Sequence, residues 1–172
     1  MALVTRQGVH GTTSTAADSI YKNGFHISKE GRAGKGVYFW HVNIYVEMMA
    51  AGWVRSRPGH TGEKISLIYS ELTCEEREIL DMENQVLLDQ LATSAVRRGI
   101  TGRAKASDVH SLYESYVASL GKKLGTTFRM VQKKLAPPPS VSENYPKIGI
   151  GEPLAYIVRD VSIIKIGRRV DK

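Results

Sequence analysis

The spacing of apolar residues predicts one helix more clearly than any other element. Over residues 107–120 the apolar side chains recur at three- and four-residue intervals, which places them on one stripe of a helix. The stripe consists of Val109, Leu112, Tyr113, Tyr116, Val117 and Leu120. Ser107 or Asp108 is suited to cap the first turn, and Gly121 is expected to end the helix. We interpret the aromatic residues of the stripe as core residues rather than as a platform for stacking bases.

Three further helices are expected from similar patterns. The first is capped by Thr13 or Ser14 and ends before Gly24, with its apolar residues on one face. The other two are expected over residues 43–54 and 83–97.

Short apolar and β-branched segments predict strands between and beyond these helices. They cover residues 4–10, 37–40, 65–72, 79–82 and 156–166, the last of which contains a turn. The segment 79–82 also fits a turn alone. Any helix over residues 128–135 must end at the three consecutive prolines that follow. Strands near both ends with helices between them indicate an α+β fold rather than regular βαβ alternation.

The composition is typical of a globular protein. We expect the chain to form a single domain over residues 1–172. Hydrophobic residues make up 42% of the chain and charged residues 24%. No apolar run nears the roughly 18 residues of a membrane span, and the first residues carry no apolar block typical of a secretory signal. Cys74 is the only cysteine, which excludes an internal disulfide and a cysteine-based zinc site and favours a small buried residue. We therefore expect a cytoplasmic protein with no metal and no membrane partner.

The charge of the chain narrows the class of partner. Its formal net charge of +7 suits an anionic partner, whether NAD, a nucleic acid or an acidic protein surface. The same charge is equally typical of a surface that only aids solubility. The basic residues gather at Arg97-Arg98, Arg103, Lys105, Lys122-Lys123, Arg129, Lys133-Lys134 and Arg168-Arg169. Phosphate backbones bind such clusters, but no recognisable nucleic-acid-binding module accompanies them here.

Two short segments carry the candidate chemistry. The first is His-Gly-Thr-Thr at residues 10–13, and the second is Gly-Lys-Gly-Val-Tyr-Phe-Trp at residues 34–40. A glycine at a strand end allows a ligand to approach the backbone closely, and a tyrosine offers a flat stacking face with a polar tip. Nicotinamide requires both, because its carboxamide binds backbone groups and its ring needs a flat partner. An enzyme that cleaves nicotinamide from ribose also orients the sugar and places negative charge near the developing cation.

In this order, with a helix-like stretch between them, the two segments resemble the poly(ADP-ribose) polymerase-like, or diphtheria-toxin-like, class of ADP-ribosyltransferases. The resemblance implies an ADP-ribosyltransferase fold, in which split antiparallel β-sheets form an NAD cleft flanked by helices. It also implies that NAD is the co-substrate. By resemblance, His10 bonds a ribose hydroxyl of the adenosine half, the backbone of Gly11 binds the nicotinamide amide, and Tyr38 stacks on the ring. Thr12 is expected to line the same cleft.

Two other parts of the resemblance leave alternatives open. The loop over residues 26–35 borders the NAD diphosphate in the family, so Lys29 or Arg32 neutralises phosphates there or belongs to a solvated basic loop. The family often has a second tyrosine that completes a sandwich around nicotinamide. Here Tyr45 comes early and Met49 falls near the expected place. Tyr45 therefore either completes the stack or packs within a helix.

The third position of the family pattern departs from expectation. Family members carry a glutamate, or a substitute, just before the strand that corresponds here to residues 156–160, and this chain has Ala155 there. Alanine can neither polarise a ribose hydroxyl nor balance a cation, and Glu152, three residues upstream, is the fallback acid. Three interpretations are open: a transferase that uses Glu152 or a substrate group, a pseudoenzyme that only binds NAD, or an enzyme silenced by an engineered Ala155. We favour the last.

The function expected from the resemblance is mono-ADP-ribosylation, in which NAD is cleaved and ADP-ribose passes to a macromolecular acceptor, nucleic acid or protein. The setting implied is a bacterial or phage-related toxin, with an antitoxin or immunity protein as partner. One alternative is an RNA 2′-phosphotransferase, which shares a His-Gly-Thr start and uses NAD. Another is a non-catalytic module that binds NAD, ADP-ribose or nucleic acid.

Overall fold

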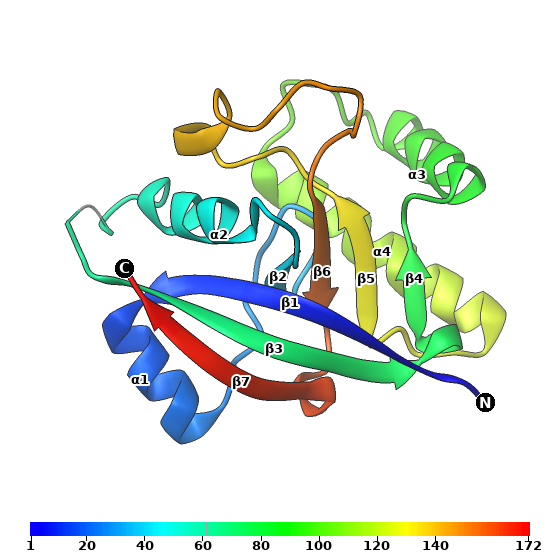
Figure 1. Cartoon of the computed structure of the whole chain (residues 1–172). Helices are drawn as coiled ribbons and strands as arrows, with labels where there is room; N and C mark the ends of the chain where they lie inside the picture. The colour runs from blue at the N-terminus through cyan, green and yellow to red at the C-terminus, as the bar shows by residue number, and fades with distance from the viewer. Residues whose placement is uncertain (61) are drawn as a thin grey trace.

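The computed structural model describes residues 1–60 and 62–172 and contains one seven-stranded mixed sheet with four α-helices among these residues (Figure 1). The strands are β1 (Leu3–Thr13), β2 (Val37–His41), β3 (Ile65–Glu75), β4 (Ile79–Asp81), β5 (Met130–Lys134), β6 (Leu154–Val158) and β7 (Ile164–Asp171). The helices are α1 (Ser14–Asn23), α2 (Val46–Arg55), α3 (Gln85–Arg97) and α4 (Ala106–Leu124). The strand order is β4-β5-β6-β2-β1-β3-β7. The expected α+β class is confirmed.

The sheet divides into two groups of strands at the junction of β1 and β2. In Figure 1, strands β1, β3 and β7 run roughly horizontally, whereas β6, β5 and β4 run roughly vertically. β1 pairs with β3 over its whole length, but with β2 only at Gly8↔His41 and Val9↔Trp40. The split antiparallel sheets that the resemblance implies are not observed, since all seven strands belong to one mixed sheet in which β4 pairs parallel to β5.

Two cores lie on opposite faces of the sheet, because successive residues of a strand point to alternate sides. Along β6, Ala155 and Ile157 belong to one core, and Tyr156 and Val158 belong to the other. Helices α2 and α4 cover the first core, where their buried residues include Val46, Met49, Leu112, Tyr113 and Val117. Helix α1 packs on the second core through Ala17. The lone cysteine, Cys74, is buried in this second core, as the sequence predicts.

Three elements differ from their predicted form. Residues 128–135 contain the strand β5 rather than a helix, and this strand pairs with β4 and β6. Helix α4 continues through Gly121 to Leu124, where Gly125 adopts a left-handed conformation with φ of 64° and ends it. Helix α2 begins only at Val46, so that Tyr45 precedes it. No helix of the described residues is both long and apolar enough to cross a membrane.

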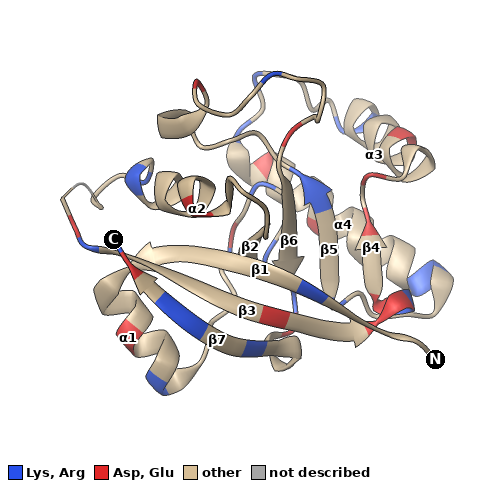
Figure 2. Cartoon of the chain, in the orientation of Figure 1, with Lys and Arg blue, Asp and Glu red and all other residues tan. Residues whose placement is uncertain are grey.

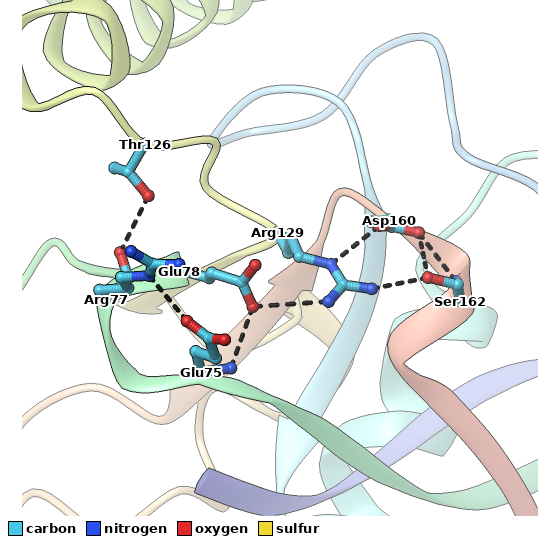
Figure 3. Close-up of polar contacts among 7 residues, drawn as sticks. All are labelled: Glu75, Arg77, Glu78, Thr126, Arg129, Asp160 and Ser162. Carbon is cyan, nitrogen blue, oxygen red and sulfur yellow. Dashed lines mark hydrogen bonds and ion pairs between the residues drawn. The ribbon is translucent and has the colours of Figure 1, made fainter. Parts of the chain in front are cut away.

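A polar network holds the lower ends of β5 and β6 to the end of β3, and Figure 3 shows its members. Arg129 Nε donates to Asp160 Oδ2 at 2.8 Å, and its other nitrogens reach Ser162 Oγ at 2.7 Å and Glu78 Oε2 at 3.4 Å. Hydrogen bonds from Ser162, followed by the guanidinium of Arg129, lower the pKa of Asp160. Arg129 is therefore engaged within the fold, although the sequence groups it with basic residues suited to phosphate.

Candidate functional site

Three of the residues singled out by sequence meet at one small cavity on the α2 side of the sheet. Gly11 from β1, Tyr38 from β2 and Ala155 from β6 all line it. Its remaining lining residues are Phe39, Trp40, Trp53 and Leu135. The cavity holds about 10 Å³ of free space, which is room for about one water molecule.

The close packing of α2 on β1 requires a glycine at position 11. A Cβ at this position would lie 2.0 Å from the carbonyl oxygen of Ala50 and 2.7 Å from its carbonyl carbon. Only glycine therefore lets the backbone of α2 pack on the strand, and this contact positions Trp53, one turn further along the helix, beside the cavity.

Tyr38 joins the cavity to the loop over residues 31–35. Its hydroxyl donates to the Gly34 carbonyl oxygen at 2.6 Å and accepts from the Ala33 N–H at 3.0 Å. Burial raises the pKa of Tyr38 to about 12, so the hydroxyl stays protonated and keeps both bonds at neutral pH. A Cβ on Gly31 would lie 2.2 Å from this hydroxyl, which explains the glycine at that position.

Helix α4 and the end of β6 hold the same loop from its other side. Glu114 receives two hydrogen bonds of 2.8 Å from Arg159, and its Oε1 also accepts from the Lys35 N–H at 2.6 Å. Burial raises the pKa of Glu114, but the bonds from Arg159 and Lys35 outweigh it and lower the pKa overall. Glu114 is thus an ionised anchor for the loop.

Arg32 lies against Trp53, one of the residues that line the cavity. Its guanidinium lies over the ring of Trp53, 5.1 Å from the ring centroid, and donates to the Ala136 carbonyl oxygen at 3.4 Å. Lys29 is exposed and forms no ion pair with the described residues. The sequence pattern marks Trp53 only as a helix residue. Trp53 lies one helical turn after Met49, near which the resemblance leads us to expect a second tyrosine, and this spacing is the signal that could have identified it.

His10 lies outside the cavity lining, and its ring packs among aromatic residues of the core on the opposite face of the sheet. The ring packs edge-on against Phe25 at 5.2 Å between centroids and lies 5.8 Å from Phe39. Its Nδ1 is 2.8 Å from the Tyr38 carbonyl oxygen. Because a carbonyl only accepts, Nδ1 carries the proton and Nε2 is left as an acceptor. Burial lowers the pKa of His10, which keeps the ring neutral at pH 7.

The other predicted residues lie outside the cavity lining. Thr12 pairs with Ser66 in the β1–β3 ladder. Tyr45 packs edge-on against Tyr145, with 5.6 Å between the ring centroids. Met49 is buried in the core and contributes no surface to the cavity.

The cavity has no acidic side chain in its lining. Ala155 is 1% exposed and lies opposite Trp40 in the β2–β6 ladder. Glu152 is exposed in the loop before β6. Within residues 1–60 and 62–172, no group of three or more His, Cys, Asp or Glu side chains is arranged to hold a metal ion.

Comparison with known proteins found no family model that matches the chain and no curated protein with significant sequence similarity to it.

Proposed function

We propose that the protein binds NAD, with the nicotinamide ring at the cavity, and that its fold serves mono-ADP-ribosylation of a macromolecule. The observation that supports this proposal most is the meeting of Gly11, Tyr38 and Ala155 on three strands. These residues are far apart in the sequence, and the motif pattern names each of them. Tyr38 and Trp53 give the cavity the flat aromatic surfaces that a nicotinamide ring requires.

The chemistry assigned to this site is cleavage of the bond between nicotinamide and ribose. Nicotinamide leaves with the bonding electrons, the ribose carbon gains cationic character, and a nucleophile of the acceptor bonds to that carbon and loses its proton. The backbone at Gly11 binds the carboxamide, and the resemblance assigns a ribose hydroxyl to the free Nε2 of His10, which lies outside the cavity lining. Stabilising the cation is the task that Ala155 cannot perform. Glu152, exposed just before β6, is the acid of this chain assigned to it.

A nicotinamide ring is larger than the free space of about 10 Å³, so binding requires the cavity to open. We assign this opening to Arg32, whose guanidinium lies over the ring of Trp53. The loop around it is held mainly by Tyr38 and Glu114, whose bonds end at residues 33–35. Arg32 can therefore move while its neighbours stay in place.

The lack of an acid in the cavity lining favours a second candidate function, a module that binds NAD or ADP-ribose without turning it over. The two candidates share the binding site and differ only in the transfer step. An acceptor that is nucleic acid or protein, a toxin setting and an antitoxin or immunity partner remain predictions of the resemblance.

Calorimetric titration with NAD tests the shared binding site. Tyr38→Ala should abolish binding, whereas Tyr45→Ala, which removes a tyrosine outside the cavity lining, should leave the affinity unchanged. Cooperative thermal unfolding of both variants shows that they fold. Equal NAD affinity for the wild type and Tyr38→Ala would refute the nicotinamide site.

Labelled NAD tests the transfer step. The wild type and Ala155→Glu are incubated with cell lysate, and mass spectrometry sorts labelled protein from labelled nucleic acid. Labelling by either form supports the transferase, and Ala155→Gln serves as the matched neutral control. NAD binding without any labelling by Ala155→Glu supports the binding module. Loss of phosphate from 2′-phosphorylated RNA in the presence of NAD would instead support the phosphotransferase.

A further inference from the structure

A groove lies between helices α3 and α4, away from the NAD site. Its central part has a volume of about 800 Å³, and its floor is formed by Leu87 of α3 with Tyr116, Leu120 and Leu124 of α4. The groove continues past Leu124 into a hollow of about 380 Å³ and past Tyr116 into one of about 250 Å³. These hollows share lining residues with the central part, so the three form one surface.

The groove exposes apolar side chains that the fold leaves uncovered. Leu91 is the only buried residue of α3, and this helix stands at the periphery of the sheet in Figure 1. Val86 is 63% exposed and Leu124 is 61% exposed, and both line the groove. The hydroxyl of Tyr116 shares its one proton between the Leu87 carbonyl oxygen at 3.3 Å and Gln90 Oε1 at 3.0 Å, and this contact holds the two helices together. The groove is thus a preformed apolar surface.

Basic side chains stand at both ends of the groove. Arg97 lines it near Tyr116, and Lys123 lines it near Leu124. Figure 2 shows basic residues at the C-terminal ends of both α3 and α4. Neither Arg97 nor Lys123 takes part in an ion pair among the residues that the structure describes. The acid of the central lining, Asp89, already accepts from Gln85 at 2.8 Å.

We propose that this groove binds an acidic amphipathic helix of a protein partner. The apolar face of that helix packs on Leu87, Leu120 and Leu124, and acidic residues near its two ends pair with Arg97 and Lys123. The part of α4 that lines the groove runs from residue 112 to residue 124. At about 1.5 Å per residue this is about 18 Å, enough for about three helical turns of the partner.

The lining favours a protein over a nucleic acid. Tyr116 is the only aromatic residue of the central part, and its hydroxyl is bound to α3. Leucine side chains bury apolar surface but offer no flat face on which bases stack. The inference does not depend on NAD binding, because no residue is shared between this groove and the NAD cavity.

A designed peptide tests the proposal on the full chain. The probe is a fluorescent helical peptide of about 12 residues, with leucines at i, i+3, i+4 and i+7 and glutamates at both ends. We expect saturable binding by fluorescence anisotropy. Replacing its glutamates with lysines should weaken binding at least tenfold, and so should Leu124→Asp or the double variant Arg97→Glu/Lys123→Glu.

Val96→Asp provides the matched control. Val96 is 78% exposed on α3 but lines no part of the groove, so this variant should bind the acidic peptide as the wild type does. No binding of the acidic peptide at millimolar concentration, or equal binding by Leu124→Asp, overturns the proposal. It is also overturned if sedimentation shows a dimer of this chain that Leu124→Asp abolishes, or if a single-stranded oligonucleotide binds the groove more tightly than the peptide.

Discussion

A hydrogen bond from the imidazole of His10 to the carbonyl oxygen of Tyr38 replaces backbone pairing at the point where β1 and β2 separate. The backbone register between these strands ends at Val9↔Trp40, and in the next position His10 Nδ1 lies 2.8 Å from the carbonyl oxygen of Tyr38. A side-chain donor therefore replaces the backbone donor that the diverging strand no longer supplies. The same bond fixes the proton on Nδ1 and turns Nε2 into an acceptor. One side chain thus joins the two halves of the sheet and leaves its Nε2 free as an acceptor.

The buried position of His10 predicts a loss of stability in mildly acidic solution. Burial lowers its pKa below the ordinary value of 6.5, so the unfolded chain binds a proton more readily than the native one. The stability that depends on a neutral His10 is complete above pH 6.5 and declines as the pH falls toward the native pKa. The free energy of unfolding, measured with urea over this pH range, should depend less on pH for His10→Gln than for the wild type.

The second histidine with a lowered pKa serves as an internal comparison. Burial also lowers the pKa of His41, whose Nδ1 lies 2.7 Å from the Tyr156 hydroxyl. In the double variant His10→Gln/His41→Gln, the free energy of unfolding should therefore depend least on pH, at pH values above the range where carboxylates titrate. If His10→Gln kept the full slope of the wild type, the neutral, Nδ1-protonated form would not be the one that the fold selects.

The packing of α2 on β1 predicts a severe effect for Gly11→Ala. The added methyl would lie 2.0 Å from the Ala50 carbonyl oxygen, and a backbone atom cannot move aside as a flexible side chain does. We expect a loss of at least about 3 kcal/mol in the free energy of unfolding. Gly102→Ala is the matched control, because nothing lies within 4 Å of its Cβ position. A Gly11→Ala variant as stable as Gly102→Ala would show that α2 shifts freely on the sheet.

The elements predicted most accurately are those whose pattern is complete within one short segment. Helix α1 ends at Asn23 as predicted, because Thr13 caps its start and Gly24 comes directly after its end. In α4 the predicted stripe faces the core, with Leu112, Tyr113 and Val117 buried. The predicted end of α4 is wrong because Gly121 is accommodated within the helix, whereas Gly125 is the glycine with positive φ. Which of two nearby glycines ends a helix depends on the tertiary contacts of the chain beyond it, and the local pattern does not contain them.

Longer-range features of the site escape prediction for a related reason. Residues 130–134 form a strand because β4 and β6 flank them, although the prolines after them suggest only the end of a helix. Tyr38 and Gly11 can be identified because each sits in a short motif. Trp53 and Glu114 belong to no motif, and their roles come from contacts with Arg32 and Lys35, which are distant in the sequence.

The anchor at Glu114 predicts faster cleavage of the loop when it is removed. Glu114→Gln replaces two charge-assisted bonds from Arg159 with a weaker neutral contact, at a site where the glutamate side chain is 25% exposed. We expect a cost of about 1 to 2 kcal/mol to the closed loop, after allowing for screening by solvent. Limited trypsin digestion should therefore cut after Arg32 and Lys35 faster than in the wild type.

Glu71→Gln is the control for this experiment. Its partner Lys165 is 80% exposed, and the pair lies on the β3–β7 edge rather than at the loop. Digestion of the loop should be unchanged in this variant. Equal cleavage of Glu114→Gln and the wild type would mean that the hydroxyl of Tyr38 suffices to hold the loop.

The contact between Arg32 and Trp53 decides between two roles of that arginine, because they predict opposite effects on NAD affinity. If Arg32 neutralises the diphosphate, as the resemblance implies, Arg32→Ala weakens NAD binding. If it chiefly occupies the face of Trp53 that nicotinamide needs, Arg32→Ala removes a competitor worth about 0.5 to 1 kcal/mol and tightens NAD binding about two- to fivefold. The geometry in which Arg32 lies over the ring at 5.1 Å favours tighter binding. Lys22→Ala, which removes one exposed charge outside this loop, corrects for the general loss of positive charge. Calorimetry of the two variants with NAD gives the sign, and weaker binding by Arg32→Ala than by Lys22→Ala would assign Arg32 to the phosphates.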